Sequence, residues 1–312
     1  MPKPKGRRKL PRPFLKWAGG KTQLLDAIQE RLPATIRDTG RIHRYVEPFL
    51  GGGAVFFYLH GMYELNETYL CDINRELIVG YKTIQKEHTA LIDRLKEIET
   101  AYLDMSQSDQ KTYYYQIRNR YNDQVQTFDY ARFNPEWIHR AAMLIFLNKT
   151  CYNGLFRQNQ QGEFNVPHGQ YVNPTICDEK NLRAVHEALQ QTTVVCGDYK
   201  VAEQFIDDET FVYFDPPYRP LNKTSSFTSY FKSNFTDEDQ RQLADFFHEM
   251  NKRGAKQILN NSDPKNENAS DEFFDELYAG ESITIERVPA KRFINSDASG
   301  RGEINELIIY NY

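Results

Sequence analysis

A strand–turn–helix–strand pattern near the start of the chain constrains the fold more than any other feature. Arg44–Glu47 predicts a short strand, Pro48–Gly53 a glycine-rich turn, and Ala54–His60 the start of a helix. Thr68–Cys71 predicts a second strand, which ends at Asp72. This succession is the opening unit of a doubly wound α/β sheet. We therefore expect an α/β fold.

Helical and strand signals divide the rest of the chain. Residues 74–147 carry apolar side chains at helical spacing without a strand signal, and Pro135 is expected near the start of the last helix there. Residues 148–174 are rich in Asn, Gln, Gly and Pro, which predicts a hairpin or an extended loop. Beyond them we expect helices at 178–190 and 237–251, and strands at 193–196, 211–214, 257–259, 282–288 and 304–310.

The α/β domain is thus expected to be interrupted by a mostly helical insertion. We expect a first α/β segment at 1–80, the insertion at 81–184 with a hairpin near 151–172, and a second α/β segment at 185–312. The 312 residues are enough for one large domain with such an insertion.

Composition excludes several classes of protein. The longest purely apolar stretch, Ala141–Leu147, is too short to span a bilayer, and no signal peptide is visible. The four cysteines form no C-x-x-C pair and the seven histidines no H-x-x-x-H pair, so we expect no metal site, free thiols and a cytoplasmic location. The net charge of −4 does not mark a nucleic-acid binder, although basic residues from Lys3 to Lys16 precede the first acid, Asp26. This basic end could contact phosphate or simply keep the chain soluble.

The tetrapeptide Asp215-Pro216-Pro217-Tyr218 follows the apolar run Phe211–Phe214. An amino group on a flat ring carries two hydrogens, which the Asp215 carboxylate and the Pro216 carbonyl could accept. Neither proline has an N–H that would compete, and both have a fixed φ. Tyr218 could stack on the ring. The alternative is an ordinary strand followed by a proline turn with a capping acid.

The glycine turn points to an adenosine-containing ligand. Its glycines, Gly51 and Gly53 among them, let the backbone approach a ligand closely. The dinucleotide fingerprint G-x-G-x-x-G fails because Phe56 replaces its last glycine. Asp72 follows about twenty residues later, where an acid commonly bonds a ribose hydroxyl. Asp198, after a later strand, could bond the adenine amino group of the same ligand.

A second glycine-containing segment lies near the N-terminus. Trp17–Thr22 looks like a phosphate-binding loop, but Leu15 stands where the Walker pattern needs glycine, so a nucleoside triphosphate site is not expected. Trp17 could instead pack on a ligand, and Lys21 could meet a carboxylate.

Five segments together resemble the Dam-type (alpha-class) DNA adenine-N6 methyltransferases. They are FLKWAGGK, VEPFLGGGAVF, YNGLFR, GEFNVPHGQY and VYFDPPYRPL…FTSY, and the similarity runs from about Pro13 to the end of the chain. The resemblance implies a Rossmann-like S-adenosylmethionine-dependent methyltransferase with an inserted, mostly helical DNA-recognition domain. It assigns cofactor contacts to Trp17, Lys21, Asp72 and Asp215, and we add Glu47, Phe49, Gly51, Gly53 and Asp198 to this site.

The resemblance also implies the reaction, a methyl transfer to adenine N6 in double-stranded DNA. Because a paired adenine cannot present N6 to a buried methyl group, the base must be flipped out, which costs a few kcal/mol. Asp215, Pro216, Pro217 and Tyr218 are then the catalytic residues, and they act by positioning the amino group for in-line attack. We expect a monomer, with a restriction endonuclease of a restriction-modification system as a possible separate partner.

Sequence recognition is expected within 149–171. Arg157 is the main candidate for reading a base, because arginine can bond guanine O6 and N7 together, and in the family the matching arginine contacts the guanine of GATC. Its alternative role is a phosphate contact. The other candidates are Tyr152, Asn153, Leu155, Pro167 and Tyr171.

Other readings of these motifs stay open. The acceptor could be cytosine N4, an RNA adenine or a protein glutamine amide, since all present a planar amino group. A DNA-binding regulator with an inactive methyltransferase fold is the non-enzymatic alternative. Arg219–Asn234 is expected to be a mobile loop that orders on DNA. Ser299–Gly302 is expected to be a hairpin turn, with a loop that contacts phosphate as the alternative.

Overall fold

The computed structural model describes residues 10–17, 19–21, 23–219, 235–291 and 303–312. Three predicted features fall wholly or largely outside these residues. They are the basic residues Lys3–Lys9, the loop at 220–234, and the turn Ser299–Gly302.

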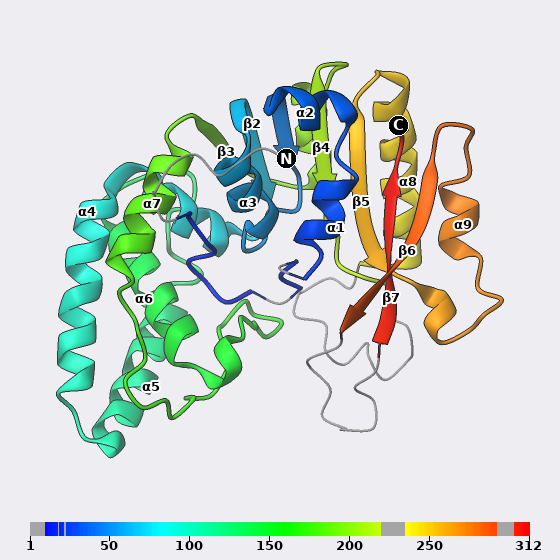
Figure 1. Cartoon of the computed structure of the whole chain (residues 1–312). Helices are drawn as coiled ribbons and strands as arrows, with labels where there is room; N and C mark the ends of the chain where they lie inside the picture. The colour runs from blue at the N-terminus through cyan, green and yellow to red at the C-terminus, as the bar shows by residue number, and fades with distance from the viewer. Residues whose placement is uncertain (1–9, 18, 22, 220–234, 292–302) are drawn as a thin grey trace.

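The described residues form one seven-stranded sheet with the order β3-β2-β1-β4-β5-β7-β6 (Figure 1). Five strands are parallel, and β7 runs antiparallel between β5 and β6. The strands are β1 (Arg41–Glu47), β2 (Glu64–Asp72), β3 (Thr192–Cys196), β4 (Thr210–Phe214), β5 (Lys256–Ser262), β6 (Thr284–Lys291) and β7 (Glu303–Tyr310). The doubly wound α/β class predicted from the sequence is confirmed.

Both faces of the sheet are buried, and alternate residues of a strand enter different cores. In β4, Phe211 and Tyr213 join the core beneath α1 to α7, whereas Val212 and Phe214 join the core beneath α8 and α9. This alternation follows from the period of two along a strand, and burial on both faces explains why β4 is uniformly apolar.

The helices begin and end where the local sequence indicates. Asn74, Ser106, Asp178 and Thr236 each cap a helix by accepting hydrogen bonds from its first backbone N–H groups. The α-helices are α1 (Leu25–Glu30), α2 (Ala34–Thr39), α3 (Ala54–Met62), α4 (Arg75–Leu103), α5 (Gln107–Asp123), α6 (Glu136–Thr150), α7 (Glu179–Leu189), α8 (Asp237–Lys252) and α9 (Phe273–Leu277). The short helices α1, α2 and α9 were not predicted.

Helices α4 to α7 follow β2 in the chain, precede β3, and gather at the β3 end of the sheet (Figure 1). A buried ion pair joins two of them: Arg140 of α6 donates from Nε and Nη2 to Glu76 of α4, at 2.8 and 2.5 Å. The predicted segment boundaries at 80/81 and 184/185 fall inside α4 and α7, and the same apolar core continues from these helices to the sheet.

Candidate active site

Three acidic residues lie where parallel strands end. Glu47 closes β1, Asp72 closes β2, and Asp215 directly follows β4. These strands are parallel, and their order switches between β1 and β4: β2 and β3 lie on one side of β1, and β4 and β5 lie on the other. The crevice at such a switch in strand order is where open α/β sheets bind ligands. We call Glu47, Asp72 and Asp215 the acidic edge.

Asp215 is paired with a buried lysine from the N-terminal segment. Lys21 Nζ lies 2.8 Å from Asp215 Oδ1, with the two side chains 7% and 20% exposed. Burial raises the pKa of Asp215 to about 6, and Lys21 opposes this shift. The carboxylate that Lys21 was expected to meet is therefore Asp215. The second oxygen, Oδ2, has no hydrogen-bond partner among the described residues.

Glu47 is the most deeply buried member of the acidic edge, at 2% exposure. Tyr45 donates from its hydroxyl to Glu47 Oε2 at 2.7 Å. Burial raises the pKa of Glu47 well above its usual value, and Asp215 and Asp72 add to the shift by like-charge repulsion.

Asp72 organises the glycine turn. Its Oδ2 accepts from the Gly51 N–H and its Oδ1 from the Asn74 N–H, both at 2.8 Å. Burial raises the pKa of Asp72 to about 6 despite these two donors. Gly51 and Gly53 have φ of 50° and 70°, a conformation that favours glycine. The Gly51 N–H thus fixes the position of the glycine turn relative to Asp72 of the acidic edge.

Trp17 is the group that closely approaches the glycine turn. A Cβ at Gly51 would lie 3.1 Å from the Trp17 indole, and one at Gly52 would lie 3.2 Å from Trp17 Cβ. The indole also stacks on Phe156, with ring centroids 5.1 Å apart. Trp17 thus joins the glycine turn to the 151–168 region.

Two further predicted cofactor residues, Phe49 and Asp198, lie just after the ends of β1 and β3. Phe49 is half-buried and stacks on Tyr199 at 5.4 Å. Asp198 is exposed, and its Oδ1 accepts from the Lys200 N–H at 3.0 Å. Ile73, directly after Asp72, leaves 63% of its surface exposed.

The backbone around the Asp-Pro-Pro-Tyr tetrapeptide is anchored from two sides. Gln240 of α8 donates to the Pro217 carbonyl at 3.0 Å, and Ser262 of β5 donates to the Arg219 carbonyl at 2.9 Å. Within the described part of the chain, no donor reaches the Pro216 carbonyl. The tetrapeptide therefore offers two acceptors close together in sequence, Asp215 Oδ2 and the Pro216 carbonyl.

Two charged groups contact the Tyr218 side chain. Its hydroxyl donates to Glu306 Oε2 at 2.6 Å, and the Lys21 ammonium lies 4.5 Å from its ring centroid. The ring is thus held at its hydroxyl and covered on a face by a cation.

Residues 151–168 form an irregular hairpin, which we call the hairpin. Cys151 bridges to His168 and Gln158 to Phe164 as isolated antiparallel pairs. The Tyr152 N–H donates to the Pro167 carbonyl at 2.8 Å. The expectation of a hairpin or loop here is confirmed.

The predicted base-reading residues lie on and just beyond the hairpin, mostly exposed. Tyr152 leaves 55% of its surface exposed, and Asn153, Arg157 and Pro167 are exposed as well. Arg157 donates from Nε to Asn165 Oδ1 at 2.7 Å, which holds its guanidinium beside the opposite strand. Leu155, by contrast, is half-buried.

Asn148, at the end of α6, ties the hairpin to the N-terminal segment. It accepts from the Lys16 N–H at 2.8 Å and donates to the Gly154 carbonyl at 3.0 Å. Beyond the hairpin, the Tyr171 ring lies under the Lys16 ammonium at 5.1 Å. The consecutive residues Lys16 and Trp17 therefore both contact the hairpin or the residues next to it.

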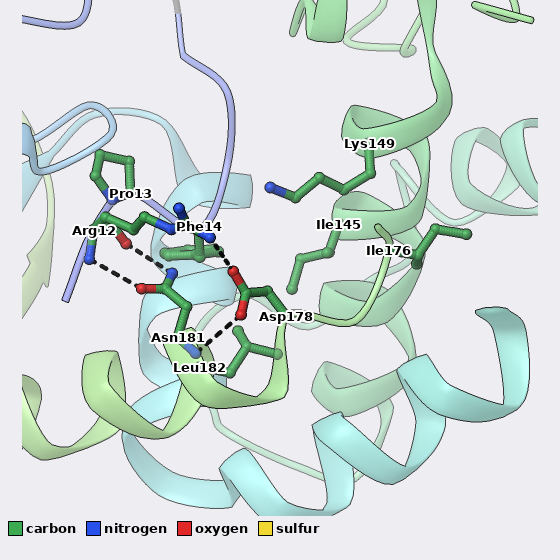
Figure 2. A pocket seen from close by; sticks show the side chains of 9 residues that line it. All are labelled: Arg12, Pro13, Phe14, Ile145, Lys149, Ile176, Asp178, Asn181 and Leu182. Atoms are coloured by element: carbon green, nitrogen blue, oxygen red, sulfur yellow. Dashed lines mark hydrogen bonds and ion pairs between the residues drawn. The ribbon is translucent and has the colours of Figure 1, made fainter. Parts of the chain in front are cut away.

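A separate cavity of about 200 Å³ lies between the N-terminal segment, α6 and α7 (Figure 2). Figure 2 shows Lys149 extending from α6 toward the segment that carries Arg12, whose guanidinium pairs with Asp178. None of the predicted site residues lines it. The lining residues are Arg12, Pro13, Phe14, Ile145, Lys149, Ile176, Asp178, Asn181 and Leu182.

Among the described residues, no group of three or more His, Cys, Asp or Glu side chains is arranged to hold a metal ion. No helix in the same residues is long and apolar enough to cross a membrane.

Sequence reasoning missed two residues that the structure places next to predicted site residues: Ile73 directly follows Asp72, and Glu306 bonds Tyr218. Ile73 had a usable signal, since it is an apolar residue directly after a strand-ending acid. Glu306 had none, because it lies 88 residues from Tyr218 in a strand that reads as ordinary β sequence.

Comparison with known proteins gives a consistent result along the chain. The family model described as D12 class N6 adenine-specific DNA methyltransferase matches residues 17–291. The type II methyltransferase M.MjaIII of Methanocaldococcus jannaschii is 46% identical, over 96% of this chain and 99% of that protein. The type II methyltransferase M1.LlaDCHI of Lactococcus lactis subsp. cremoris is 35% identical, over 96% of this chain and 95% of that protein. The DNA adenine methylase of Vibrio cholerae is 33% identical, over 95% of each.

Proposed function

This chain belongs to the D12 class of N6 adenine-specific DNA methyltransferases, and we propose that it methylates adenine N6 within GATC in double-stranded DNA. The methyl donor in this proposal is S-adenosylmethionine, and the target base is flipped out of the duplex. The family model and the relatives confirm the resemblance noted from the sequence. Because this family is specific for adenine in DNA, we no longer consider cytosine, RNA adenine or protein glutamine as the acceptor.

One observation carries the proposed chemistry. Asp215 Oδ2 and the Pro216 carbonyl both lack partners among the described residues, and they lie beside an anchored Tyr218 ring. The adenine amino group has two hydrogens to donate, and its ring has a face to stack. The tetrapeptide thus matches the exocyclic side of a flipped adenine.

The residues at the acidic edge fit the cofactor. S-adenosylmethionine supplies an electrophilic methyl group on a cationic sulfur when bound. Burial raises the pKa values of Asp72 and Asp215 to about 6, and a nearby cation stabilises such buried carboxylates in their charged form. The Lys21 ammonium already provides a cation beside Asp215. The residues that would hold the cofactor are Trp17, Lys21, Glu47, Phe49, Gly51, Gly53, Asp72, Ile73, Asp198 and Asp215.

The chain's own residues act mainly by positioning. Asp215 Oδ2 and the Pro216 carbonyl accept the two N6 hydrogens, so the nitrogen lone pair is directed away from the adenine ring. The N–C bond would form as the methyl–sulfur bond breaks with its electron pair staying on sulfur. N6 then loses one proton, and Asp215 Oδ2 is placed to accept it before releasing it to water. Tyr218 stacks on the base and offsets part of the few kcal/mol that flipping costs.

Base reading is assigned to the exposed side of the hairpin and the residue that follows it. Arg157 presents its guanidinium beside Asn165 and is proposed to bond a guanine of the site. Tyr152 and Asn153 are proposed to fill the space that the flipped adenine leaves. The names of two relatives as type II methyltransferases support a role beside a restriction endonuclease.

The decisive experiment maps methylated bases in DNA from a host that lacks DNA methylation and expresses this chain. We expect N6-methyladenine at every GATC and far less of it with the Asp215→Ala variant. N4-methylcytosine, or N6-methyladenine in a different sequence, would contradict the chemistry or the recognition site respectively.

Cofactor binding has its own test. A ligand present at a hundred times its Kd stabilises a folded protein by about 2.7 kcal/mol. We expect S-adenosylmethionine to raise the melting temperature accordingly, and the Asp72→Ala variant to lose that shift.

A further inference from the structure

Tyr218 is held by a residue from the far end of the chain. Its hydroxyl donates to Glu306 Oε2 at 2.6 Å, across a sequence separation of 88 residues. Glu306 lies early in β7, and β7 is antiparallel to β5. Because of that direction, the first half of β7 lies at the edge of the sheet where the parallel strands end.

The strand register explains why Glu306 can reach the ring. Glu306 pairs with Ser262 of β5, and Ser262 donates to the Arg219 carbonyl, one residue after Tyr218. The paired residues Ser262 and Glu306 therefore contact two consecutive residues of the turn. Ser262 bonds the backbone of Arg219, and Glu306 bonds the side chain of Tyr218.

The backbone and the ring of Tyr218 are held by different groups. Gln240 and Ser262 fix the backbone at Pro217 and Arg219. Asn261 also accepts from the Arg219 N–H at 3.2 Å. These bonds hold the backbone and do not contact the aromatic ring. The ring is contacted by Glu306 at its hydroxyl and by the Lys21 ammonium on a face, and only the Glu306 contact is a hydrogen bond.

We propose that Glu306 is a positioning residue for methyl transfer: it holds the Tyr218 ring in the orientation that stacks on the flipped purine. This inference rests on the proposed function and extends it to a residue of the antiparallel strand. Glu306 does not touch the base in this scheme, so it acts only through Tyr218.

The test is a double-mutant cycle between the two residues. Replacing Tyr218 by Phe keeps the ring and removes the hydroxyl, and Glu306→Leu removes the acceptor. We expect each single variant to lower kcat for a GATC duplex about tenfold, as for the loss of one hydrogen bond to a charged group. The double variant should be no slower than the slower single variant, because both changes remove the same interaction.

A second Tyr–Glu pair, which joins β7 to β6, provides a matched control. Tyr310 of β7 donates to Glu286 of β6, away from the strand ends that carry the acidic edge. Glu286→Leu should lower the melting temperature and leave kcat within about twofold of the wild type. If Glu286→Leu lowers kcat as much as Glu306→Leu, or if the two losses in the cycle multiply, Glu306 acts through the sheet and the inference fails.

The isosteric variant Glu306→Gln separates geometry from charge. Its amide oxygen still accepts from Tyr218, so kcat near neutral pH should stay within about threefold of the wild type. Glu306 also contributes to the raised pKa of Asp215, so the acidic limb of the kcat profile should move to lower pH. The other groups that act on Asp215 or are coupled to it are Lys21, Glu47, Tyr45, Tyr213 and Tyr218, and they are unchanged in this variant.

Failure of the inference and failure of the proposed function give different results. If the wild type transfers no methyl group to adenine in DNA, the proposed function is wrong. If the wild type is active and Glu306→Gln keeps the wild-type pH profile while the cycle is additive, only the role of Glu306 is wrong.

Discussion

The acidic edge and the hairpin differ in how far their side chains are already in place. Asp72 and Asp215 are largely buried, and each is held by partners from distant parts of the chain. On the hairpin, Tyr152 and Asn153 are exposed, and within the described part of the chain Arg157 donates hydrogen bonds only to its hairpin neighbour Asn165. Under the proposed function, we therefore expect the acidic edge to be arranged before substrate binds and the hairpin side chains to take their final positions on the DNA.

This difference follows from what each region must do. A reacting group gains most from being fixed in advance, because a displacement of about 1 Å can cost 10²-fold in rate. Base reading instead depends on hydrogen bonds that form only with the correct sequence. The hairpin is nevertheless not free, because Asn148 and Trp17 attach it to the N-terminal segment and the glycine turn.

The largest expected effect concerns the helices that support the hairpin. Arg140→Met leaves Glu76 buried without its cation, and breaking such a pair costs about 3–5 kcal/mol. Urea unfolding of the variant should show this loss. The double variant Glu76→Leu/Arg140→Met should recover much of it, and a similar loss in both variants would indicate that the charges themselves are not the cause.

A change at the acidic edge should affect rate and spare binding. Asp215→Ala removes one acceptor for the N6 hydrogens, so we expect kcat to fall by about 10²–10³-fold, as for other preorganised hydrogen-bond groups. Single-turnover kinetics would measure the loss, and a gel-shift assay should show DNA affinity within a few-fold of the wild type. A variant that keeps near-normal turnover would contradict the positioning role.

A change on the hairpin should do the reverse. Arg157→Ala should cost about 1–3 kcal/mol of discrimination at one base pair of the site. Methylation rates on duplexes with each single substitution in GATC would measure it, with Arg94→Ala, at a partly exposed position on α4, as the control. A uniform loss on all duplexes, with a reduced salt dependence of binding, would instead assign Arg157 to a phosphate.

The smallest predicted effect comes from the titration of Asp215. As the pH rises, the stability that Asp215 contributes should fall, whereas activity should rise. The pKa of Asp215 is about 6 in the folded protein and about 3.9 when unfolded. The folded state thus binds this proton more tightly, so the associated stability is complete below about pH 4 and is lost as the pH rises through about 6. Activity, which needs the carboxylate, should rise over the same interval.

Comparison with the Asp215→Asn variant isolates this effect. The difference in unfolding free energy between the wild type and the variant should shift against the wild type as the pH rises from about 4 to about 7. A constant difference over this range would mean that Asp215 is not desolvated in the free enzyme.

Most of the sheet could be predicted, because strands and capped helices have short-range signatures. The strand predicted at 211–214 matches β4, and the helix predicted at 237–251 matches α8 to within two residues. The positions of Asp72 and Asp215 at strand ends followed from the same patterns. The helices α1, α2 and α9 were missed because five or six residues carry too little periodicity to be recognised.

The partners of these residues could not be predicted in the same way. Lys21 was expected to meet some carboxylate, but only the folded chain identifies Asp215. Trp17 was expected to pack on a ligand, and it lies between the glycine turn and Phe156 of the hairpin. Each of these contacts joins segments more than thirty residues apart, for which a single sequence holds no local signal.

Local patterns were thus enough to identify the α/β class, the acidic strand ends and the family. Strand order and direction then decided which distant side chains meet at those ends, above all Glu306 with Tyr218. The physical reason is that periodicity, capping and turn chemistry act within a few residues, whereas strand order and direction result from burying both faces of one sheet at once.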